Sequence, residues 1–291
     1  VSYDVVSGEA KEIGSGILSG PMGIFVTETG EIYVADPAAE TLFVFNADGT
    51  LKKRMERPNS YLIGEDSMYQ PKNVCVSHNG NIFVVGVGAY EGIMQFSADG
   101  EFLGYFAANE RKLTFAETVE DMLLTKEQKQ SLTLRIPRSI ENIDITDDDL
   151  IYSVTRFDSS DRDKKEKSIK LHNMVGTDIL SSVGRKEEWN FVDISSGNHG
   201  NVYAVTETGL VYEYDRAGEL LFSFGGRAVS NDRLGLFTKA AALDVDQSGV
   251  VYILDTERNL VQTFFPTEYA ALTHRAVSLL NDGKYEGSRQ V

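Results

Sequence analysis

The chain has 291 residues, 42% of them hydrophobic, and its 28 Lys plus Arg against 44 Asp plus Glu give a formal net charge of −16. This length and apolar content suffice for one large domain, and the acidic balance opposes nucleic-acid binding because like charge repels a phosphate backbone. No stretch approaches the roughly 18 consecutive apolar residues of a membrane span, so we expect no membrane contact.

The predicted elements begin with a short strand at residues 2–6, where side-chain character alternates. From residue 21 a longer pattern starts, and it occurs five times. Each copy holds an apolar run, a turn with Gly or Asp, a second run centred on an aromatic residue, another turn and a third run. The aromatic anchors recur at intervals of about 50 residues, with one longer interval. They are Tyr33, Phe83, Tyr152, Tyr203 and Tyr252.

Three or four strands per repeat of this length is the content of one propeller blade, a small antiparallel sheet packed against its neighbours. The sequence therefore predicts an all-β fold, a propeller of five four-stranded blades, with six blades as the alternative. After the last run Pro266 ends the sheet and no fourth strand follows. We expect the strand at residues 2–6 to complete this last blade and so close the ring. Cys75, between two valines, is expected in the core.

The longer interval comes from an insertion near residues 110–136, which is predicted to be helical. Thr114 with Glu117 and Thr125 with Gln128 each fit a capping box, in which two side chains satisfy the free amides of a first helical turn. The favoured interpretation is a flap that caps one mouth of the ring, and the alternative is a lid over a ligand site. The charged stretch at residues 158–167 is expected to be a solvated loop.

Beyond Pro266 the pattern becomes helical. Thr267 is expected to cap a helix that ends before Gly283, and Lys284 begins another. We therefore divide the chain into a propeller, residues 1–265, and a C-terminal helical segment, residues 266–291.

The copies resemble NHL repeats over about residues 15–265, most closely in the first copy, through Pro21, Gly23, Gly30, Tyr33 and Asp36. The C-terminal segment resembles the first helix and turn of a tetratricopeptide repeat. The resemblance implies a bacterial protein that is larger than this chain. With the absence of an initial Met, it leads us to expect an extracytoplasmic or cell-surface location.

Lactonases of the gluconolactonase type also resemble this fold and hold one divalent cation on the propeller axis. The resemblance implies axial positions just before each first run, where oxygen donors suited to Ca²⁺ are Glu141, Asn142, Asn73 and Asn190. Lys72 and Lys239 at the same level would offset their charge. We predict no cofactor, with Ca²⁺ at this set as the alternative.

Other chemistry finds less support. Zinc needs three or four converging ligands, and the four histidines, His78, His172, His199 and His274, lie at no inner-strand entry. The run from Asp244 to Gly249 imitates the start of a calcium loop, but a hairpin turn explains it better. No nucleophile is paired in sequence with a base.

The sequence thus favours a non-enzymatic scaffold that binds a protein, peptide or glycan at one mouth of the propeller. The first alternative is a divalent-metal-dependent hydrolase, and the second, RNA binding, is opposed by the charge.

Overall fold

The computed structural model describes residues 1–4, 7–60, 62–63, 68–87, 92–107, 139–155, 168–180, 191–229 and 233–291. The helix predicted at residues 110–136, the charged loop at residues 158–167 and Asn190 lie outside these residues.

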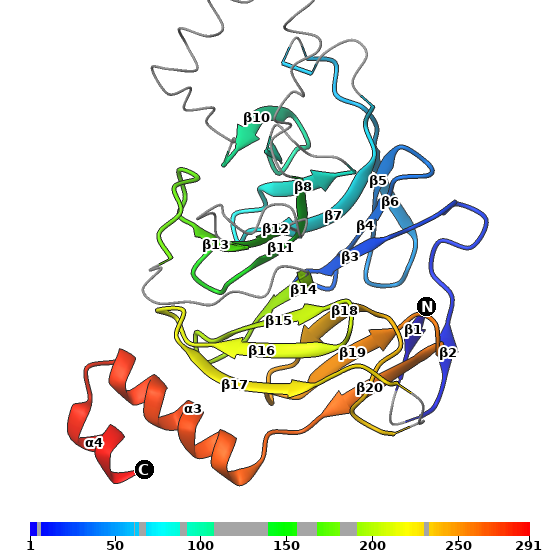
Figure 1. The fold of residues 1–291 in the computed structure, drawn as a ribbon. Coiled ribbons are helices and arrows are strands. Elements are labelled where there is room, and N and C mark those ends of the chain that lie inside the picture. The colour runs from blue at the N-terminus through cyan, green and yellow to red at the C-terminus, as the bar shows by residue number, and fades with distance from the viewer. Residues whose placement is uncertain are drawn as a thin grey trace, which may run out of the picture.

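Five antiparallel sheets form a five-bladed propeller, as predicted, and within each blade neighbouring strands follow one another in the chain (Figure 1). Blade 1 holds β3 (Gly23–Val26), β4 (Ile32–Asp36), β5 (Thr41–Phe45) and β6 (Leu51–Met55). Blade 2 holds β7 (Pro71–Val76), β8 (Ile82–Gly86), β9 (Ile93–Phe96) and β10 (Phe102–Phe106). Blade 3 holds β11 (Ile140–Ile145), β12 (Ile151–Thr155) and β13 (Ile169–His172).

Blade 4 holds β14 (Phe191–Ser196), β15 (Val202–Thr206), β16 (Leu210–Tyr214) and β17 (Leu220–Gly225). Blade 5 holds β18 (Ala240–Val245), β19 (Val251–Asp255) and β20 (Leu260–Phe264). Among the described residues, blades 3 and 5 therefore have three strands each, where four were expected. Each aromatic anchor lies on the second strand of its blade, as the repeat predicts.

Consecutive blades pack against each other through hydrophobic clusters. Each cluster is formed by the side chains that two neighbouring blades direct toward one another. In blade 1, Tyr33 and Val44 point toward blade 2, where they meet Val74 and Phe96. Similar clusters join blades 2 and 3, blades 3 and 4, and blades 4 and 5. Cys75 is fully buried in the cluster between blades 2 and 3, which confirms its predicted place in the core.

The N-terminal segment does not complete blade 5, so that prediction is wrong. The strand β1 (Ser2–Tyr3) pairs instead with β2 (Ala10–Lys11) in a separate two-stranded sheet. The following residues, among them Ile13, Ile17 and Leu18, cover the face of blade 1 that points away from blade 2. The physical reason is that Ile32, Val34, Phe43 and Phe45 make this face strongly apolar, and its burial outweighs one more strand pairing at the edge of blade 5.

In blades 1 and 5, a buried aspartate at the end of the second strand binds backbone amides of the segment that precedes the first strand. In blade 1 the carboxylate of Asp36 accepts hydrogen bonds from the amides of Ser19, at 2.6 Å, and Gly20, at 3.0 Å. In blade 5 Asp255 accepts in the same way from Thr238, at 2.7 Å. These side chains explain why the pattern places Asp after an Ile-Tyr-Val-type run.

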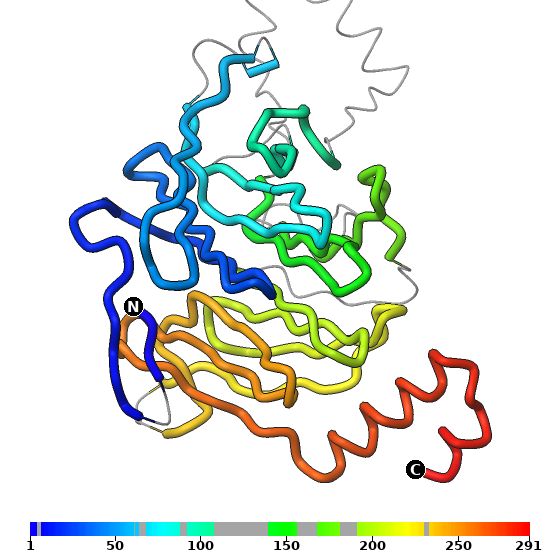
Figure 2. Tube along the Cα trace, turned by 180° about the vertical axis from the view of Figure 1, so that it is seen from behind, coloured from blue at the N-terminus to red at the C-terminus, as the bar shows by residue number. Residues whose placement is uncertain are grey.

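Two helices follow blade 5, as predicted. The helix α3 (Glu268–Asn281) begins after Thr267, whose Oγ1 accepts a hydrogen bond from the amide of Ala270 at 3.2 Å. The chain turns at Gly283, with a φ of 75°, into α4 (Tyr285–Gln290). Figures 1 and 2 both show α3 running along the outer side of blade 4, beside β17. Neither described helix is long and apolar enough to span a membrane.

Candidate functional site

The first strands of the five blades, β3, β7, β11, β14 and β18, surround the centre of the ring and line a cavity of about 490 Å³. A larger cavity of about 960 Å³ adjoins it and shares several lining residues with it, including Phe25, Asp144 and Asp244. Its walls include the turns that join first and second strands, and we call it the turn mouth. A cavity of this size, built from all five blades, is the default location for a binding site.

The turn mouth is acidic. Six carboxylates line it, and no Lys or Arg does so among the described residues. They are Glu28, Glu31, Asp144, Asp147, Asp149 and Asp244. Glu31 is neutralised by an ion pair with Lys52, whereas the side chain of Glu28 is 86% exposed. The cavity is therefore suited to groups that carry positive charge.

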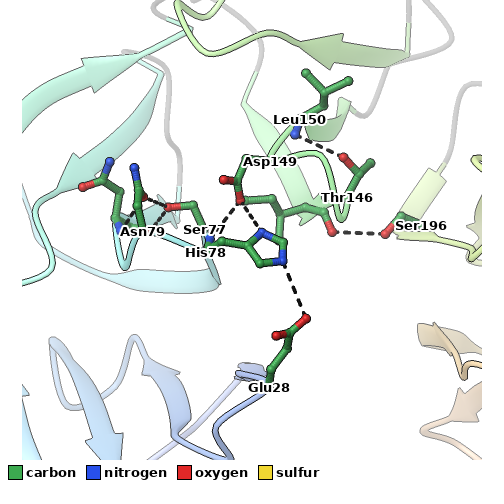
Figure 3. Close-up of polar contacts among 10 residues, drawn as sticks. Glu28, Ser77, His78, Asn79, Thr146, Asp149, Leu150 and Ser196 are labelled. Atoms are coloured by element: carbon green, nitrogen blue, oxygen red, sulfur yellow. Dashed lines mark hydrogen bonds and ion pairs between the residues drawn. The ribbon is translucent and has the colours of Figure 1, made fainter.

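His78 lies between two of these carboxylates, where the turns of three blades meet (Figure 3). The amide and the Nδ1 atom of His78 each lie 2.9 Å from Oδ1 of Asp149. The Nε2 atom lies 3.6 Å from Oε1 of Glu28, on blade 1. The hydrogen bond to Asp149 raises the pKa of His78, and the charges of Asp149, Glu28 and Asp147 raise it further. Protonated His78 is the cation that this arrangement favours.

Asp149 occupies a turn position at which the other four copies have glycine. Its φ is 58°, and the equivalent Gly30, Gly80, Gly200 and Gly249 all have positive φ as well. A side chain in this left-handed region costs about 1–2 kcal/mol relative to glycine, although Asp tolerates it better than most residues. The carboxylate that this residue provides receives two hydrogen bonds from His78, which offsets the strain.

Three aspartates connect the inner strands: Asp193 and two that also line the turn mouth. Asp193 on β14 accepts hydrogen bonds from the side-chain amide of Asn142 on β11 and from the backbone amide of Leu243 on β18. Burial raises the pKa of Asp193 to about 8. Asp144 accepts from the amide of Ser196 at 2.6 Å, and burial raises its pKa to about 6. These carboxylates join blades 3, 4 and 5.

Asp244, the third of them, accepts a hydrogen bond from Oγ of Ser195 at 3.2 Å. Burial raises its pKa as well. The turn that follows Asp244 closes through backbone hydrogen bonds: the amide of Gly249 donates to the carbonyl of Asp246 at 2.9 Å. The run that imitates a calcium loop is therefore a hairpin turn, as preferred from the sequence.

The structure brings together three of the four residues predicted as calcium ligands, because Asn73, Glu141 and Asn142 all line the central cavity. Each is already engaged. Glu141 lies 2.6 Å from Nζ of Lys72, Asn142 donates to Asp193, and Oδ1 of Asn73 accepts from the amide of Val74. No group of three or more His, Cys, Asp or Glu side chains in the described part of the chain is arranged to hold a metal ion. The calcium set stays a prediction: the polar atoms of these three residues have other partners in the structure, and Asn190 lies outside the described residues.

The sequence analysis missed Asp144 and Asp193 as members of the site. One signal was present for Asp144: the first-strand residues that pair with the aromatic anchors share one register position, and all of them except Cys75 line the two cavities. They are Phe25, Cys75, Asp144, Ser195 and Asp244. Two carboxylates in such a row of first strands mark a polar channel wall. No comparable signal identified Asp193, whose role depends on bonds to two other blades.

No family model matches the sequence, and no curated protein does so either. Solved structures share the fold. The WD40 β-propeller domain of Doa1 has a TM-score of 0.52 at 13% identity, over 85% of this chain and 64% of that one. A streptogramin B lyase has a TM-score of 0.48 at 14% identity, over 86% and 84% of the two chains. A catalytically inactive virginiamycin B lyase from Staphylococcus aureus, with quinupristin, has a TM-score of 0.47 at 12% identity, over 85% and 71%.

What the Doa1 domain shares with the chain is the propeller fold. Identities of this size carry no information about ligand or reaction. The resemblances to NHL and tetratricopeptide repeats stay predictions.

Proposed function

We propose that this propeller is a non-enzymatic binding platform that takes a protein or peptide segment rich in Lys or Arg at its turn mouth. The observation that carries the proposal is the cavity of about 960 Å³, which all five blades build and six carboxylates line. A rigid concave surface of one charge sign attracts and orients partners of the opposite sign.

Two features support binding rather than catalysis at this site. The polar side chains of the turn mouth bond mainly to each other across blades, as His78 does with Asp149 and Ser196 does with Asp144. Such bonds stiffen the rim and leave exposed carboxylates such as Glu28 and Asp147 to meet a partner.

A direct test titrates the protein against a fluorescein-labelled hexalysine peptide and follows fluorescence anisotropy at low ionic strength. We expect saturable binding that weakens as salt is added, and no binding of hexaglutamate. The double variant Glu28→Gln, Asp147→Asn removes two rim charges and should weaken binding by about fivefold, because exposed ion pairs contribute a few tenths to one kcal/mol each.

The matched control is Glu268→Gln, Asp282→Asn, which removes two charges from α3 and its C-terminal cap that do not line the turn mouth. It should bind the peptide as the unaltered protein does. Equal weakening in both double variants would show that net charge, not the turn mouth, attracts the peptide. Absence of saturable binding would overturn the proposal.

The metal-dependent hydrolase is tested separately by thermal unfolding in EDTA and then in Ca²⁺. We expect no shift, because Lys72 already neutralises Glu141 at 2.6 Å. A cation bound only by the folded protein at a hundredfold excess over its Kd would add about 2.7 kcal/mol, which is a shift of several degrees. Such a shift, lost in Glu141→Gln, would favour the hydrolase.

A further inference from the structure

The C-terminal helix α3 contacts the propeller through one buried histidine. Of the 14 residues of α3, all described, His274 alone is buried, with 6% of its surface exposed. Tyr269 and Leu272, on the same helix, are exposed. A helix with so little buried apolar surface depends strongly on the contact that its one buried side chain makes.

The side chain opposite His274 is a buried carboxylate of blade 4. Glu213, on β16, is 3% exposed, and its Oε1 lies 2.5 Å from Nε2 of His274. Nε2 of His274 makes no hydrogen bond, and its contact with Glu213 is an ion pair when His274 is protonated. Asn201 also donates to Oε1, at 2.6 Å. Burial and the neighbouring Glu213 raise the pKa of the Tyr203 hydroxyl.

Aromatic rings surround the pair. The ring of Phe222, on β17, packs edge-on against His274 and against Tyr269, with centroid distances of 6.0 Å in each case. The ring of His199, in the turn between β14 and β15, lies 5.7 Å from that of His274. The titratable groups that face His274 are therefore Glu213, Tyr203 and His199 on blade 4, and Tyr269 on its own helix.

We propose that His274 and Glu213 form a pH-sensitive latch that holds α3 on blade 4 while His274 is protonated. A buried carboxylate that loses its counter-charge is costly, and removing one partner of a buried pair destabilises more than the pair itself stabilises. Histidine is the side chain whose charge most readily changes between about pH 5 and 8, so a buried contact between a histidine and a carboxylate can respond to pH. Docking of α3 is favoured while His274 is a cation and Glu213 an anion, and it weakens as the pH rises and His274 loses its proton.

An undocked α3 has a measurable signature. A helix of fewer than about 15 residues is marginal in water by itself, so release from blade 4 also opens the backbone hydrogen bonds of α3. The amides of α3 would then exchange with solvent while those of β15 and β16 stay protected. This difference distinguishes release of the helix from unfolding of the blade.

The experiment is hydrogen-exchange mass spectrometry of the whole chain at pH 5.5, 6.5, 7.5 and 8.5, with rates divided by the intrinsic rate at each pH. For the unaltered protein we expect the protection of α3 to fall at least tenfold across this series, with β15 and β16 unchanged. His274→Gln and Glu213→Gln should each give low protection of α3 that no longer depends on pH. The double variant should lose little more than either single one, because the two side chains act as a pair.

His199→Gln is the matched control, because His199 contacts the same ring but no carboxylate of the pair; it should keep the pH profile of the unaltered protein. Protection of α3 that is constant from pH 5.5 to 8.5 in the unaltered protein overturns the proposal, and that result needs no variant to fold. A pH profile that persists in His274→Gln, or that disappears in His199→Gln, overturns the assignment to His274.

Discussion

At the scale of single residues, the backbone strain at Asp149 and the contribution of its carboxylate can be tested separately. Asp149→Gly keeps the positive φ without strain but removes the carboxylate, whereas Asp149→Asn keeps a side chain that tolerates this region and removes only the charge. Asp149→Ala loses the carboxylate and retains the strain. We expect the glycine variant to exceed the alanine variant in free energy of unfolding by about 1 kcal/mol, measured by urea denaturation. Equal stability of the two would contradict the strain at this turn.

The same variants test the electrostatic role of Asp149 toward His78. Because Asp149 raises the pKa of His78, NMR titration of the ring should give a lower pKa in Asp149→Asn and in Asp149→Gly than in the unaltered protein. The stabilisation from the raised pKa is fully present at low pH and is lost as the pH rises through the folded-state pKa. An unchanged titration of His78 would place its main partner elsewhere.

The sequence could predict the turn residue Asp149 but not its partner. A residue at the glycine position of a repeated turn is visible from spacing alone. His78 comes from the equivalent turn of the preceding blade, and their contact depends on the angle between the two blades. For Glu141 the sequence did indicate a partner, because Lys72 was expected at the same axial level. Their ion pair joins blades 2 and 3 and neutralises a carboxylate that would otherwise be available to a cation.

At the scale of elements, Asp193 connects three inner strands and makes the stability of the ring depend on pH. Its pKa, raised to about 8 by burial, means that the folded protein binds this proton more tightly than the unfolded chain does. The free energy of unfolding should therefore decrease as the pH rises from about 4 to about 8, by at most about 1.4 kcal/mol per pH unit for this one group.

Asp193→Asn removes the titrating group and should reduce that slope, together with a constant loss because an amide cannot accept all the hydrogen bonds that the carboxylate accepts. Urea denaturation at pH 5, 6, 7 and 8 measures both. The exposed Asp282→Asn should leave the slope unchanged. An unchanged slope in Asp193→Asn would mean that the carboxylate is ionised in the folded protein throughout this range.

The approach of β3 to β7 depends on Gly23. A Cβ atom at this position would lie 2.5 Å from the carbonyl oxygen of Lys72 and 2.8 Å from Cα of Asn73, both backbone atoms that cannot move independently of the strand. Gly23→Ala should lower the free energy of unfolding by about 1–3 kcal/mol, as overpacking does.

Gly287→Ala is the matched control in a urea denaturation series. Its Cβ atom would meet only the Leu279 side chain, at 3.6 and 3.8 Å, which is ordinary contact. Alanine favours the helix α4 by about 0.5–1 kcal/mol over glycine. A stable Gly23→Ala variant would show that the inner strands of blades 1 and 2 can separate without cost.

Strand positions were predictable because period-two alternation and turn glycines are local properties of the chain. The place of the N-terminal segment was not. Alternation at residues 2–6 indicates a strand, but the choice between the edge of β20 and the partner β2 depends on what covers the apolar face of blade 1. Ile13 and Leu18 cover it, and they lie too close to the start of the chain to belong to any repeat.

At the scale of the whole molecule, the net charge of −16 predicts how stability responds to salt. Charges of one sign repel each other in the compact state, and screening weakens this repulsion beyond about 10 Å at 0.1 M salt. We expect the Tm to rise by a few degrees between 10 mM and 0.3 M NaCl. Tetramethylammonium chloride should raise the Tm by the same amount, because its cation coordinates too weakly to occupy a site made of oxygen ligands. A Tm that falls in both salts would contradict the expectation.

Every described sheet is built from strands that follow one another in the chain, and the described ends of the chain do not pair with each other. During synthesis on the ribosome each blade can therefore form as soon as its own segment emerges. Blade 1, covered by the residues that precede it, can be a finished surface before blade 5 has been translated. In a propeller whose first and last strands pair, the edge of the incomplete blade stays exposed until translation ends. Here each blade is formed by one continuous segment, so each new blade can pack on the preceding one as soon as it is synthesised.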